Sequence, residues 1–228
     1  MNVLITGTNS GIGFYLAKEF IKNNFTVIAL DRTYNNFFKK EKNYNFISFN
    51  LEKLEENNLE QIFLKIPIDI AILNAGIAHP LQLLSTIKQS NLNNIFNINV
   101  WANKTIIDLL IDKTSVKQII AISSGIVDNY SKGWGGYYLS KILLNELISI
   151  YAIEHQSIHF SSIYPHIIKT KMTNMLIKTT NKDIFPSILY LKSQRLGNLD
   201  KEAKLIYTAI KNIKNKKSGI NIHLDEII

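Results

Sequence analysis

Cysteine is absent from this chain of 228 residues. The sequence therefore excludes a disulfide framework, thiolate metal ligands and a cysteine nucleophile. No apolar run approaches the roughly eighteen residues that would indicate a membrane-spanning helix. The first residues, MNVLITGTNSGIG, have no basic leader and no small-residue cleavage site, so we expect a strand there and not a signal peptide. These absences predict a soluble cytoplasmic protein without a membrane partner.

Arginine is also scarce, since it occurs only at Arg32 and Arg195, although the net charge is +8. Lysine supplies the remaining positive charge and is scattered with asparagine through every segment. Proteins that read base edges use arginine forks, and nucleic-acid-binding domains gather their cations on one face or element. We therefore interpret the charge as a chain-wide bias in composition and expect no nucleic-acid partner.

Strand-like and helix-like patterns alternate along the whole chain. Short apolar runs typical of strands occupy residues 2–5, 26–30, 45–49, 69–73, 117–123, 157–164 and 219–224. Helical periodicity leads from a glycine-rich stretch to about Lys22 and covers residues 52–64, 91–112, 136–155 and 200–215. This alternation predicts parallel βαβ units with right-handed crossovers. We expect one α/β domain over residues 1–228, with about seven strands in a doubly wound parallel sheet between two helical layers.

The least patterned part of the chain, residues 171–195, is a candidate substrate lid within that domain. It contains Pro186 and the loop-like stretch KTTNKD. Its apolar residues include Met172, Met175, Leu176, Ile177, Phe185, Ile188, Leu189 and Tyr190. Such a set suits a partly hydrophobic carbonyl or alcohol substrate, and it equally suits ordinary packing of lid helices.

The glycine-rich stretch TGTNSGIG lies between the first predicted strand and the first predicted helix. Gly7 permits a tight turn, Gly11 lets the backbone approach a phosphate, and Gly13 lets the helix pack close to the sheet. The helix N-terminus offers free N–H groups to an anion. This arrangement predicts a site for the diphosphate of a dinucleotide. The residues expected to bind it are Gly7, Asn9, Ser10, Gly11, Ile12 and Gly13.

The second predicted strand ends at Asp31, close to the roughly twenty residues beyond the glycines at which an acid bonds the adenosine ribose. Asp31 would repel a 2′-phosphate, which favours NAD over NADP as the cofactor. Arg32 leaves NADP possible, because it could be a fork for phosphate, although it could also be a platform for adenine or a solvated surface residue.

Together with four further motifs, the glycine turn makes the chain resemble the short-chain dehydrogenase/reductase family over nearly its whole length. The stretch at 6–13 is similar to that family's TGxxxGxG turn, and Asn74, Ala75 and Gly76 match its NAG motif. Asn99 in NINV matches the family's helix asparagine, ISSG at 122–125 its serine motif, and residues 137–141 its YxxxK motif. The resemblance implies a Rossmann-like fold and hydride transfer between a nicotinamide cofactor and a carbonyl or alcohol.

Two tyrosines, Tyr137 and Tyr138, precede Lys141 in the stretch GGYYLSK. Helical spacing puts either phenol near the ammonium group and does not choose between them. In the family the tyrosine stands four residues before the lysine and commonly thirteen after the serine. Counting back from Tyr137 reaches Ser124, whereas counting back from Tyr138 reaches Gly125, which has no hydroxyl. The resemblance therefore makes Tyr137 the catalytic candidate and leaves Tyr138 as packing or subunit-contact surface.

The resemblance assigns a role to each of four residues. Tyr137 would be the general acid or base, and Lys141 would lower the pKa of its phenol and bond the nicotinamide ribose. Ser124 would donate a hydrogen bond to the substrate oxygen as charge develops there. Asn99 would hold a water that leads protons from Lys141 toward solvent.

Further cofactor contacts follow from the resemblance. Asn50 and Leu51 occupy the place where an acidic residue usually caps the adenine, and asparagine can replace it as a hydrogen-bonding group. The segment YPHIIKT resembles the family's PGxVxT, so Pro165, Ile168 and Thr170 would lie at the nicotinamide amide.

The five histidines carry few predictions. His166 replaces the family glycine of PGxVxT, so we expect strain if an unusual backbone torsion is needed there, and an alternative role at the substrate mouth. His79, His155, His159 and His223 are expected to be ordinary surface or strand residues. Since no pair of histidines has metal-ligand spacing with an acidic partner, we predict no metal site.

The assembly predicted by resemblance is a homodimer or homotetramer formed through the helices at 91–112 and 136–155. Both helices carry apolar residues beyond one helical stripe, which supports the same prediction; these residues are Trp101, Ile106, Ile107, Leu143, Leu144, Leu147 and Ile148.

Three functions remain open from the sequence. The first is an NAD(P)-dependent oxidoreductase acting on a small carbonyl or alcohol. The second is a non-catalytic sensor of redox state, or an interaction protein, that uses the same nucleotide pocket; the presence of all four candidate catalytic residues argues against it. The third is epimerase or dehydratase chemistry on a nucleotide sugar, although relatives of that kind are usually longer.

Overall fold

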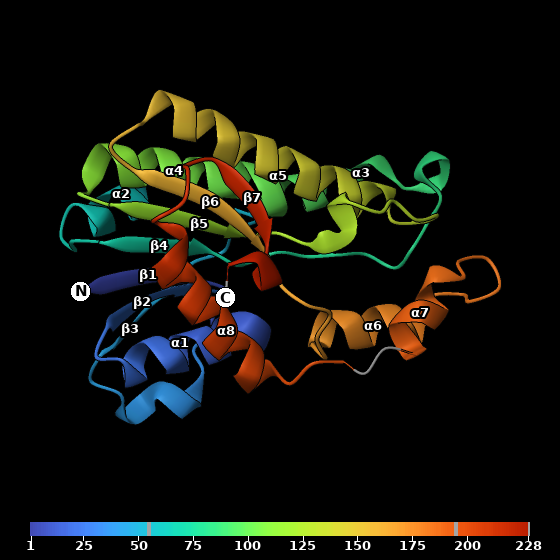
Figure 1. The fold of residues 1–228 in the computed structure, drawn as a ribbon, viewed down its shortest axis with the longest axis horizontal. Coiled ribbons are helices and arrows are strands. Elements are labelled where there is room, and N and C mark those ends of the chain that lie inside the picture. Colours follow the sequence, from blue (N-terminus) through green and yellow to red (C-terminus); the bar gives the residue numbers. More distant parts are fainter. Residues whose placement is uncertain (54–55, 194–195, 228) are drawn as a thin grey trace.

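The computed structural model describes residues 1–53, 56–193 and 196–227. Its centre is a seven-stranded sheet with the order β3-β2-β1-β4-β5-β6-β7, in which every neighbouring pair of strands is parallel. Figure 1 shows helices on both sides of this sheet. The predicted α/β class and the doubly wound parallel sheet are therefore confirmed.

The elements follow the predicted alternation closely. The strands are β1 (Asn2–Thr6), β2 (Thr26–Asp31), β3 (Tyr44–Ser48), β4 (Ile70–Leu73), β5 (Gln118–Ile122), β6 (His159–Tyr164) and β7 (Ile220–His223). The α-helices are α1 (Gly11–Lys22), α2 (Glu56–Phe63), α3 (Gln89–Phe96), α4 (Ala102–Lys113), α5 (Gly135–Glu154), α6 (Lys171–Thr179), α7 (Ser187–Ser193) and α8 (Leu199–Ile213). Two predicted helices differ from this arrangement.

The helix predicted over residues 91–112 is interrupted. A π-helical turn at Asn97–Trp101 separates α3 from α4. The amide of Ala102 bonds to the carbonyl of Asn97, five residues back, so this turn holds one more residue than an α-helical turn. Periodicity did not indicate the insertion, because apolar residues continue on both sides of it.

The helix predicted over residues 52–64 begins later, at Glu56. A turn in which the Lys53 amide donates to the Asn50 carbonyl at 2.9 Å precedes it. Residues 54–55, which the prediction included, lie outside the described residues.

Two apolar layers hold the helices against the sheet. In β1, Val3, Leu4 and Ile5 are fully buried, because both faces of a central parallel strand are covered. Val3 and Ile5 pack with residues of α1 and α8 on one face. Leu4 belongs to the cluster formed with α2, α4 and α5 on the other face. The continuous apolar runs in the sequence are explained by this double coverage.

The apolar residues predicted to form a subunit interface are largely core residues. Ile106, Ile107, Leu144 and Ile148 are almost completely buried, in the cluster between α4, α5 and the sheet. Trp101, which the prediction included, is 45% exposed; Leu139, Ile150 and Ile153, which it did not include, are 39%, 49% and 74% exposed. Helical position alone did not distinguish them, because these helices are apolar around most of their circumference.

Most of the candidate lid segment forms α6 and α7, and its last residues, 194–195, lie outside the described residues. The two helices share a third apolar cluster with the loops that follow β4 and β5. Its buried members are Ala78, Leu81, Trp134, Leu176, Phe185, Ile188 and Leu191. Figure 1 shows α6 and α7 projecting beyond one edge of the layered body of the molecule.

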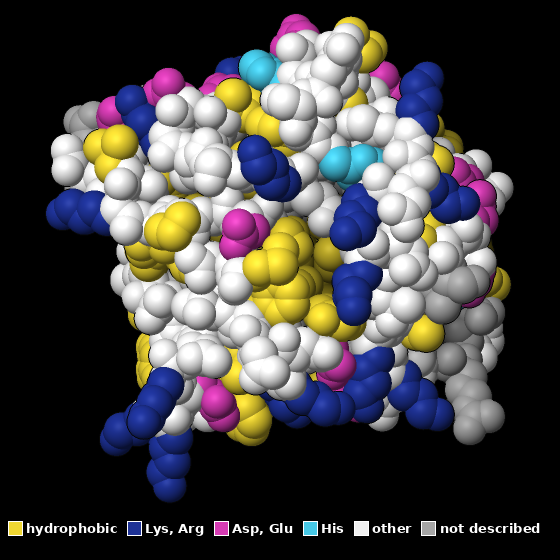
Figure 2. Space-filling view, turned by 60° about the vertical axis from the view of Figure 1, so that its left-hand side comes forward, with side chains coloured by type: hydrophobic (Ala, Val, Ile, Leu, Met, Phe, Trp, Pro, Cys, Tyr) yellow, Lys and Arg dark blue, Asp and Glu magenta, His cyan; other side chains and the backbone are white. Residues whose placement is uncertain are grey.

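The surface shown in Figure 2 carries dispersed positive charge. Lysine and arginine side chains are spread over this face, with acidic and neutral side chains between them. A chain-wide excess of lysine produces this distribution. Within the described ranges, no helix is both long enough and apolar enough to cross a membrane.

Candidate active site

A cleft of about 1290 Å³ opens at the carboxyl ends of the strands. Residues that follow each of the seven strands line it, from Gly7 after β1 to Leu224 after β7. Ligands of open parallel sheets bind outside these ends, where the strand order reverses, which here is between β1 and β4. All the predicted site residues line this cleft except Gly13 and Asn99, which are buried.

The glycine turn has the backbone that its sequence predicts. Gly7 and Gly11 have φ angles of +76° and +61°, in the left-handed region that favours glycine. A Cβ atom on Gly13 would lie 2.2 Å from the carbonyl oxygen of Gly7, so only glycine lets α1 start this close to the turn. The Ser10 side chain makes no capping hydrogen bond to the helix. The turn therefore presents helix N–H groups that can bind an anion.

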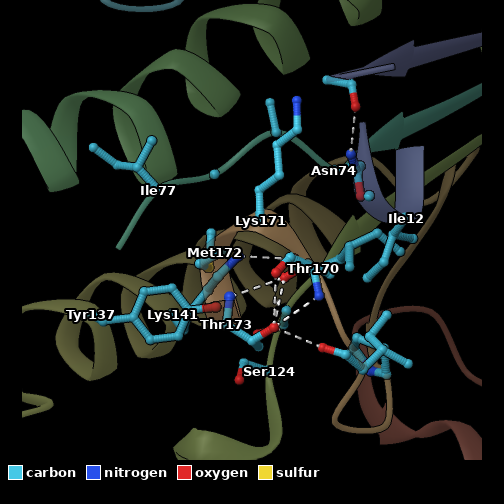
Figure 3. A pocket seen from close by; sticks show the side chains of 18 of the residues that line it. Ile12, Asn74, Ile77, Ser124, Tyr137, Lys141, Thr170, Lys171, Met172 and Thr173 are labelled. Carbon is cyan, nitrogen blue, oxygen red and sulfur yellow. Dashed lines mark hydrogen bonds between the residues drawn. The ribbon is translucent and has the colours of Figure 1, made fainter. Parts of the chain in front are cut away.

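The turn is tied to the end of β4 by a residue that the sequence analysis missed. Thr6 Oγ1 accepts hydrogen bonds from the amides of Asn74 and Ala75, both at 2.9 Å. Asn74 Nδ2 donates to the carbonyls of Thr6 and Gly7, at 2.9 and 3.2 Å. These bonds hold the two sides of the strand-order reversal together. Asn74 is thus a brace for the glycine turn as well as a lining residue (Figure 3).

One end of the cleft is acidic. Asp31 Oδ2 accepts a hydrogen bond from the amide of Asn9 at 2.8 Å. The guanidinium of Arg32 lies 3.3 Å from Glu52 Oε1, and the amide of Glu52 donates to Asn50 Oδ1 at 3.0 Å. Arg32 is therefore paired with a carboxylate, and two carboxylates, Asp31 and Glu52, line this end. Glu52 was missed because nothing in its local sequence relates it to a residue twenty positions earlier.

Asn99 is completely buried in the π-helical turn. Its Nδ2 donates to the Ile77 carbonyl and to Ser140 Oγ, both at 3.0 Å, and its Oδ1 accepts from the Ile77 amide at 2.8 Å. Its main-chain carbonyl accepts from Asn103 Nδ2 at 2.8 Å. The side chain thus joins the loop after β4 to α5. The water-holding role predicted for Asn99 stays a prediction.

Tyr137, Ser124 and Lys141 meet in the middle of the cleft (Figure 3). The hydroxyl of Ser124 lies near enough to the Tyr137 phenol to influence its pKa, and Ser124 Oγ accepts a hydrogen bond from the amide of Ile126 at 3.3 Å. Lys141 Nζ donates to the Ile122 carbonyl at 2.9 Å and lies 5.8 Å from the centre of the Tyr137 ring. Tyr138 is not among the lining residues. Its ring packs edge-on against that of Tyr130, with 5.3 Å between the ring centres.

Burial is the main influence on the ionisation of Tyr137 and Lys141. Burial raises the pKa of Tyr137 to about 12, and the nearby Ser124 hydroxyl only partly opposes this rise. Burial also lowers the pKa of Lys141 to about 8. The pKa of the phenol thus lies above its ordinary value, and the lowering of this pKa by Lys141 stays a prediction. Near neutral pH both groups are protonated, so the pair can act as a proton donor.

The segment after β6 also borders the cleft, at Pro165, Ile168 and Thr170. Thr170 Oγ1 accepts a hydrogen bond from the amide of Thr173 at 3.1 Å, and Thr173 Oγ1 accepts one from the amide of Thr170 at 2.8 Å. Thr170 is thus the N-cap of α6, with a reciprocal capping box. The segment thereby connects the site to the candidate lid.

His166 is not strained. Among the described residues other than glycine, only Asn24 has a positive φ angle, so the predicted strain at His166 is wrong. His166 lines the cleft, in agreement with its alternative role, and its ring contacts Glu202 and Asp225. His223, expected to be an ordinary residue, also lines the cleft, and its Nε2 lies 2.5 Å from Asp128 Oδ2.

Trp134 is a further lining residue that the sequence analysis missed. Its ring centre lies 6.2 Å from that of Tyr137, and its Nε1 donates to Ser187 Oγ in α7 at 3.0 Å. A usable signal existed, because Trp134 stands three residues before Tyr137 and so on the same side of a helix. Other apolar lining residues from this region are Ile126, Met172, Leu176 and Leu191.

Comparison with known proteins matches residues 1–181 to the family described as short chain dehydrogenase. The benzil reductase ((S)-benzoin forming) of Bacillus cereus is 26% identical, over 98% of this chain and 99% of that protein. The 3-oxoacyl-[acyl-carrier-protein] reductase of Buchnera aphidicola is 31% identical, over 75% of each chain.

Solved structures of low identity show the same fold. A Saccharomyces cerevisiae short chain dehydrogenase/reductase has a TM-score of 0.86 at 17% identity, covering 98% of this chain and 96% of that one. A Brucella melitensis 3-ketoacyl-(acyl-carrier-protein) reductase complexed with NADH has a TM-score of 0.79 at 21% identity, covering 97% and 95%. A Shigella flexneri short chain dehydrogenase complexed with NADP has a TM-score of 0.83 at 19% identity, covering 98% and 96%.

Proposed function

The chain belongs to the short-chain dehydrogenase family and is an oxidoreductase that acts on carbonyl or alcohol groups, and from this premise we propose that it reduces a small uncharged carbonyl compound with NADH. The observation that carries the proposal is that Tyr137, Ser124 and Lys141 line the same cleft, with the ammonium group of Lys141 5.8 Å from the centre of the phenol ring. Both relatives described above are named reductases, which supports reduction of a carbonyl as the direction of the reaction.

The residues of the cleft fit a nicotinamide dinucleotide. The cradle at Gly13, which a Cβ atom would fill, and the uncapped start of α1 suit the diphosphate. Asp31 would bond the adenosine ribose, Asn50 and Leu51 would contact the adenine, and Pro165, Ile168 and Thr170 would contact the nicotinamide. When bound, NADH supplies the hydride for the carbonyl carbon.

We favour NADH over NADPH because of the charges at the acidic end. A 2′-phosphate there would face the carboxylates of Asp31 and Glu52. Arg32, the side chain that could have bound it, is engaged by Glu52. Structural neighbours with NADH and with NADP support a nicotinamide cofactor of either kind, so this preference depends on the charges of this chain.

Within this proposal, the chain's own residues handle the proton. The phenol of Tyr137 donates its proton to the carbonyl oxygen as the hydride reaches the carbon, which yields the alcohol. Ser124 donates a hydrogen bond to the same oxygen while negative charge develops on it. The ammonium group of Lys141 stabilises the resulting phenolate, and a group with a pKa of about 8 can return a proton to it near neutral pH.

The lining of the cleft near Tyr137 favours an uncharged substrate with aromatic or apolar substituents. Trp134, Ile126, Met172 and Leu176 contribute mostly apolar surface. We propose that α6 and α7 act as the lid over this substrate, since Trp134 and Tyr137 pack with the same apolar cluster as those helices. The match to benzil reductase over nearly the full length of both chains supports the same substrate class.

The test is a spectrophotometric assay of NADH oxidation with purified protein. Benzil and other aromatic diketones should be reduced, with a higher kcat/KM than acyl thioesters of the 3-oxo type. Turnover of the thioesters alone would contradict the substrate class and leave the reductase activity standing. Tight NADH binding with no turnover of any carbonyl would favour the sensor alternative.

We also propose a homodimer through the face formed by α4 and α5. Its exposed apolar side chains include Trp101, Ile150 and Ile153. Light scattering should give twice the mass of the chain or a multiple of it, and Ile153→Glu should reduce the mass to that of one chain.

A further inference from the structure

The segment that follows β6 is held by a histidine between two carboxylates. The main-chain amide of His166 donates to Glu202 Oε1 at 2.8 Å. Its ring nitrogen Nδ1 lies 3.0 Å from Glu202 Oε2, and Nε2 lies 2.8 Å from Asp225 Oδ1. Glu202 is in the first turn of α8, and Asp225 is in the 3-10 turn Leu224–Glu226 that follows β7. His166 therefore joins three parts of the chain that are far apart in sequence.

Both ring contacts require a protonated ring. A neutral imidazole can donate from only one nitrogen, whereas an imidazolium donates from both. The charged groups that face His166 are Glu202 from α8 and Asp225 from the turn after β7, and both are acidic. Their hydrogen bonds, first that of Glu202, raise the pKa of His166 above its ordinary value. Glu202 is only 4% exposed, and a buried carboxylate without a cation would be costly.

The segment that His166 holds, residues 165–170, leads to the residues proposed to contact the nicotinamide. Next to His166, the carbonyl of Ile167 accepts from the amide of Gly197 at 3.1 Å. The carbonyl of Ile168 accepts from Thr173 Oγ1 at 3.1 Å, and Thr170 then caps α6. The segment is thus fixed at its start by His166 and at its end by α6. The residues between these two points include Ile168, which lines the cleft.

We propose that His166 is a positioning residue for the cofactor: its imidazolium ties the segment 165–170 to α8 and to the turn after β7, and NADH binds most tightly when this tie is intact. The inference rests on the proposed function, because NADH is the ligand whose affinity changes. Both ring hydrogen bonds are made at pH values below the pKa of His166, and one of them is lost as the pH rises through it. NADH affinity falls over the same interval.

The test is the dissociation constant of NADH, measured by fluorescence titration of the protein alone from about pH 6 to about pH 9, a range that starts near the ordinary histidine pKa. In the unmodified protein the constant should increase about tenfold over this range, the loss of roughly one charge-assisted hydrogen bond. His166→Gln should bind weakly at every pH. His166→Arg should bind tightly at every pH, because a guanidinium keeps its charge and has several N–H donors for the two carboxylates.

Two further variants are controls. One removes an exposed partner of His166 without affecting folding, and the other removes a different histidine. Asp225→Asn cannot disturb the core, since 76% of the Asp225 side chain is exposed, and it should weaken binding at low pH and flatten the pH dependence. His155→Gln removes a histidine outside the cleft and should behave like the unmodified protein. The inference is overturned if His166→Gln and the unmodified protein have the same constant at each pH. Failure of every form to bind NADH would overturn the proposed function as well.

Discussion

Lys141 Nζ lies 5.8 Å from the centre of the Tyr137 ring and donates its hydrogen bond to the main-chain carbonyl of Ile122. The two side chains stand one helical turn apart on α5, between the sheet and the cleft. Burial raises the pKa of Tyr137 to about 12 and lowers that of Lys141 to about 8, so near neutral pH the phenol is protonated and the amine still carries its proton. Four predictions test what this site does.

Replacing Tyr137 by phenylalanine removes the proposed proton donor and keeps the ring. Carbonyl reduction by Tyr137→Phe should fall about a thousandfold, within the range expected for loss of a general acid. The dissociation constant of NADH should change little, because the diphosphate and adenosine contacts are made elsewhere. Steady-state kinetics and a fluorescence titration measure the two effects.

Tyr138→Phe is the matched control. Tyr138 packs against Tyr130 and does not line the cleft, so its variant should keep nearly full activity. A large loss with Tyr138→Phe and none with Tyr137→Phe would mean that the spacing to Ser124 selected the wrong phenol.

Lys141→Met should stabilise the fold while it reduces activity. Lys141 is 4% exposed, and burial lowers the pKa of its ammonium group from 10.5 to about 8. Below the folded pKa the protein carries a buried charge, so the variant should be more stable at pH 7, by about 2 kcal/mol. Between the folded and unfolded pKa values the unfolded chain binds more protons, so the unmodified protein gains relative stability as the pH rises.

The measurement is the free energy of unfolding in urea for both proteins at neutral pH and again near the unfolded pKa of lysine, about 10.4. The difference in stability between Lys141→Met and the unmodified protein should shrink at the higher pH. A constant difference would show that the ammonium group is not desolvated.

Cofactor choice should follow the two carboxylates at the acidic end of the cleft. The unmodified protein should bind NADH at least about tenfold more tightly than NADPH, since each like-charge contact with a 2′-phosphate costs on the order of 1 kcal/mol. Glu52→Gln releases Arg32 from its ion pair and should strengthen NADPH binding. Parallel titrations with both dinucleotides decide this, and a preference of the unmodified protein for NADPH would refute the proposed role of Asp31.

Gly13→Ala should be more damaging than Gly11→Ala. The new Cβ atom would lie 2.2 Å from the Gly7 carbonyl oxygen, so α1 must move away from the turn, at a cost of about 3 kcal/mol, with loss of NADH binding. At Gly11 the nearest atom is 3.9 Å away, and the cost comes from the positive φ angle, about 1 kcal/mol. Urea unfolding curves of the two variants give the comparison, and equal losses would show that close packing is not the reason for glycine at Gly13.

Much of the fold and the membership of the site could be predicted from local patterns. Alternating apolar runs and helical periodicity predicted seven parallel strands, because a strand covered on both faces is apolar throughout. The glycine turn and the spacing of Ser124, Tyr137 and Lys141 predicted which residues line the cleft. The π-helical turn around Asn99 could not be predicted, since the apolar pattern continues through it.

The sequence by itself determined the order of the elements and the identity of the family, because these depend on spacing along the chain and on the residue types that a turn or strand allows. Only the tertiary structure decided the environment of each side chain. The pairing of Arg32 with Glu52 and the tie from His166 to Glu202 and Asp225 join residues that are 20, 36 and 59 positions apart. The burial of a side chain likewise depends on elements that are distant in sequence, and for Tyr137 it raises the pKa above its ordinary value.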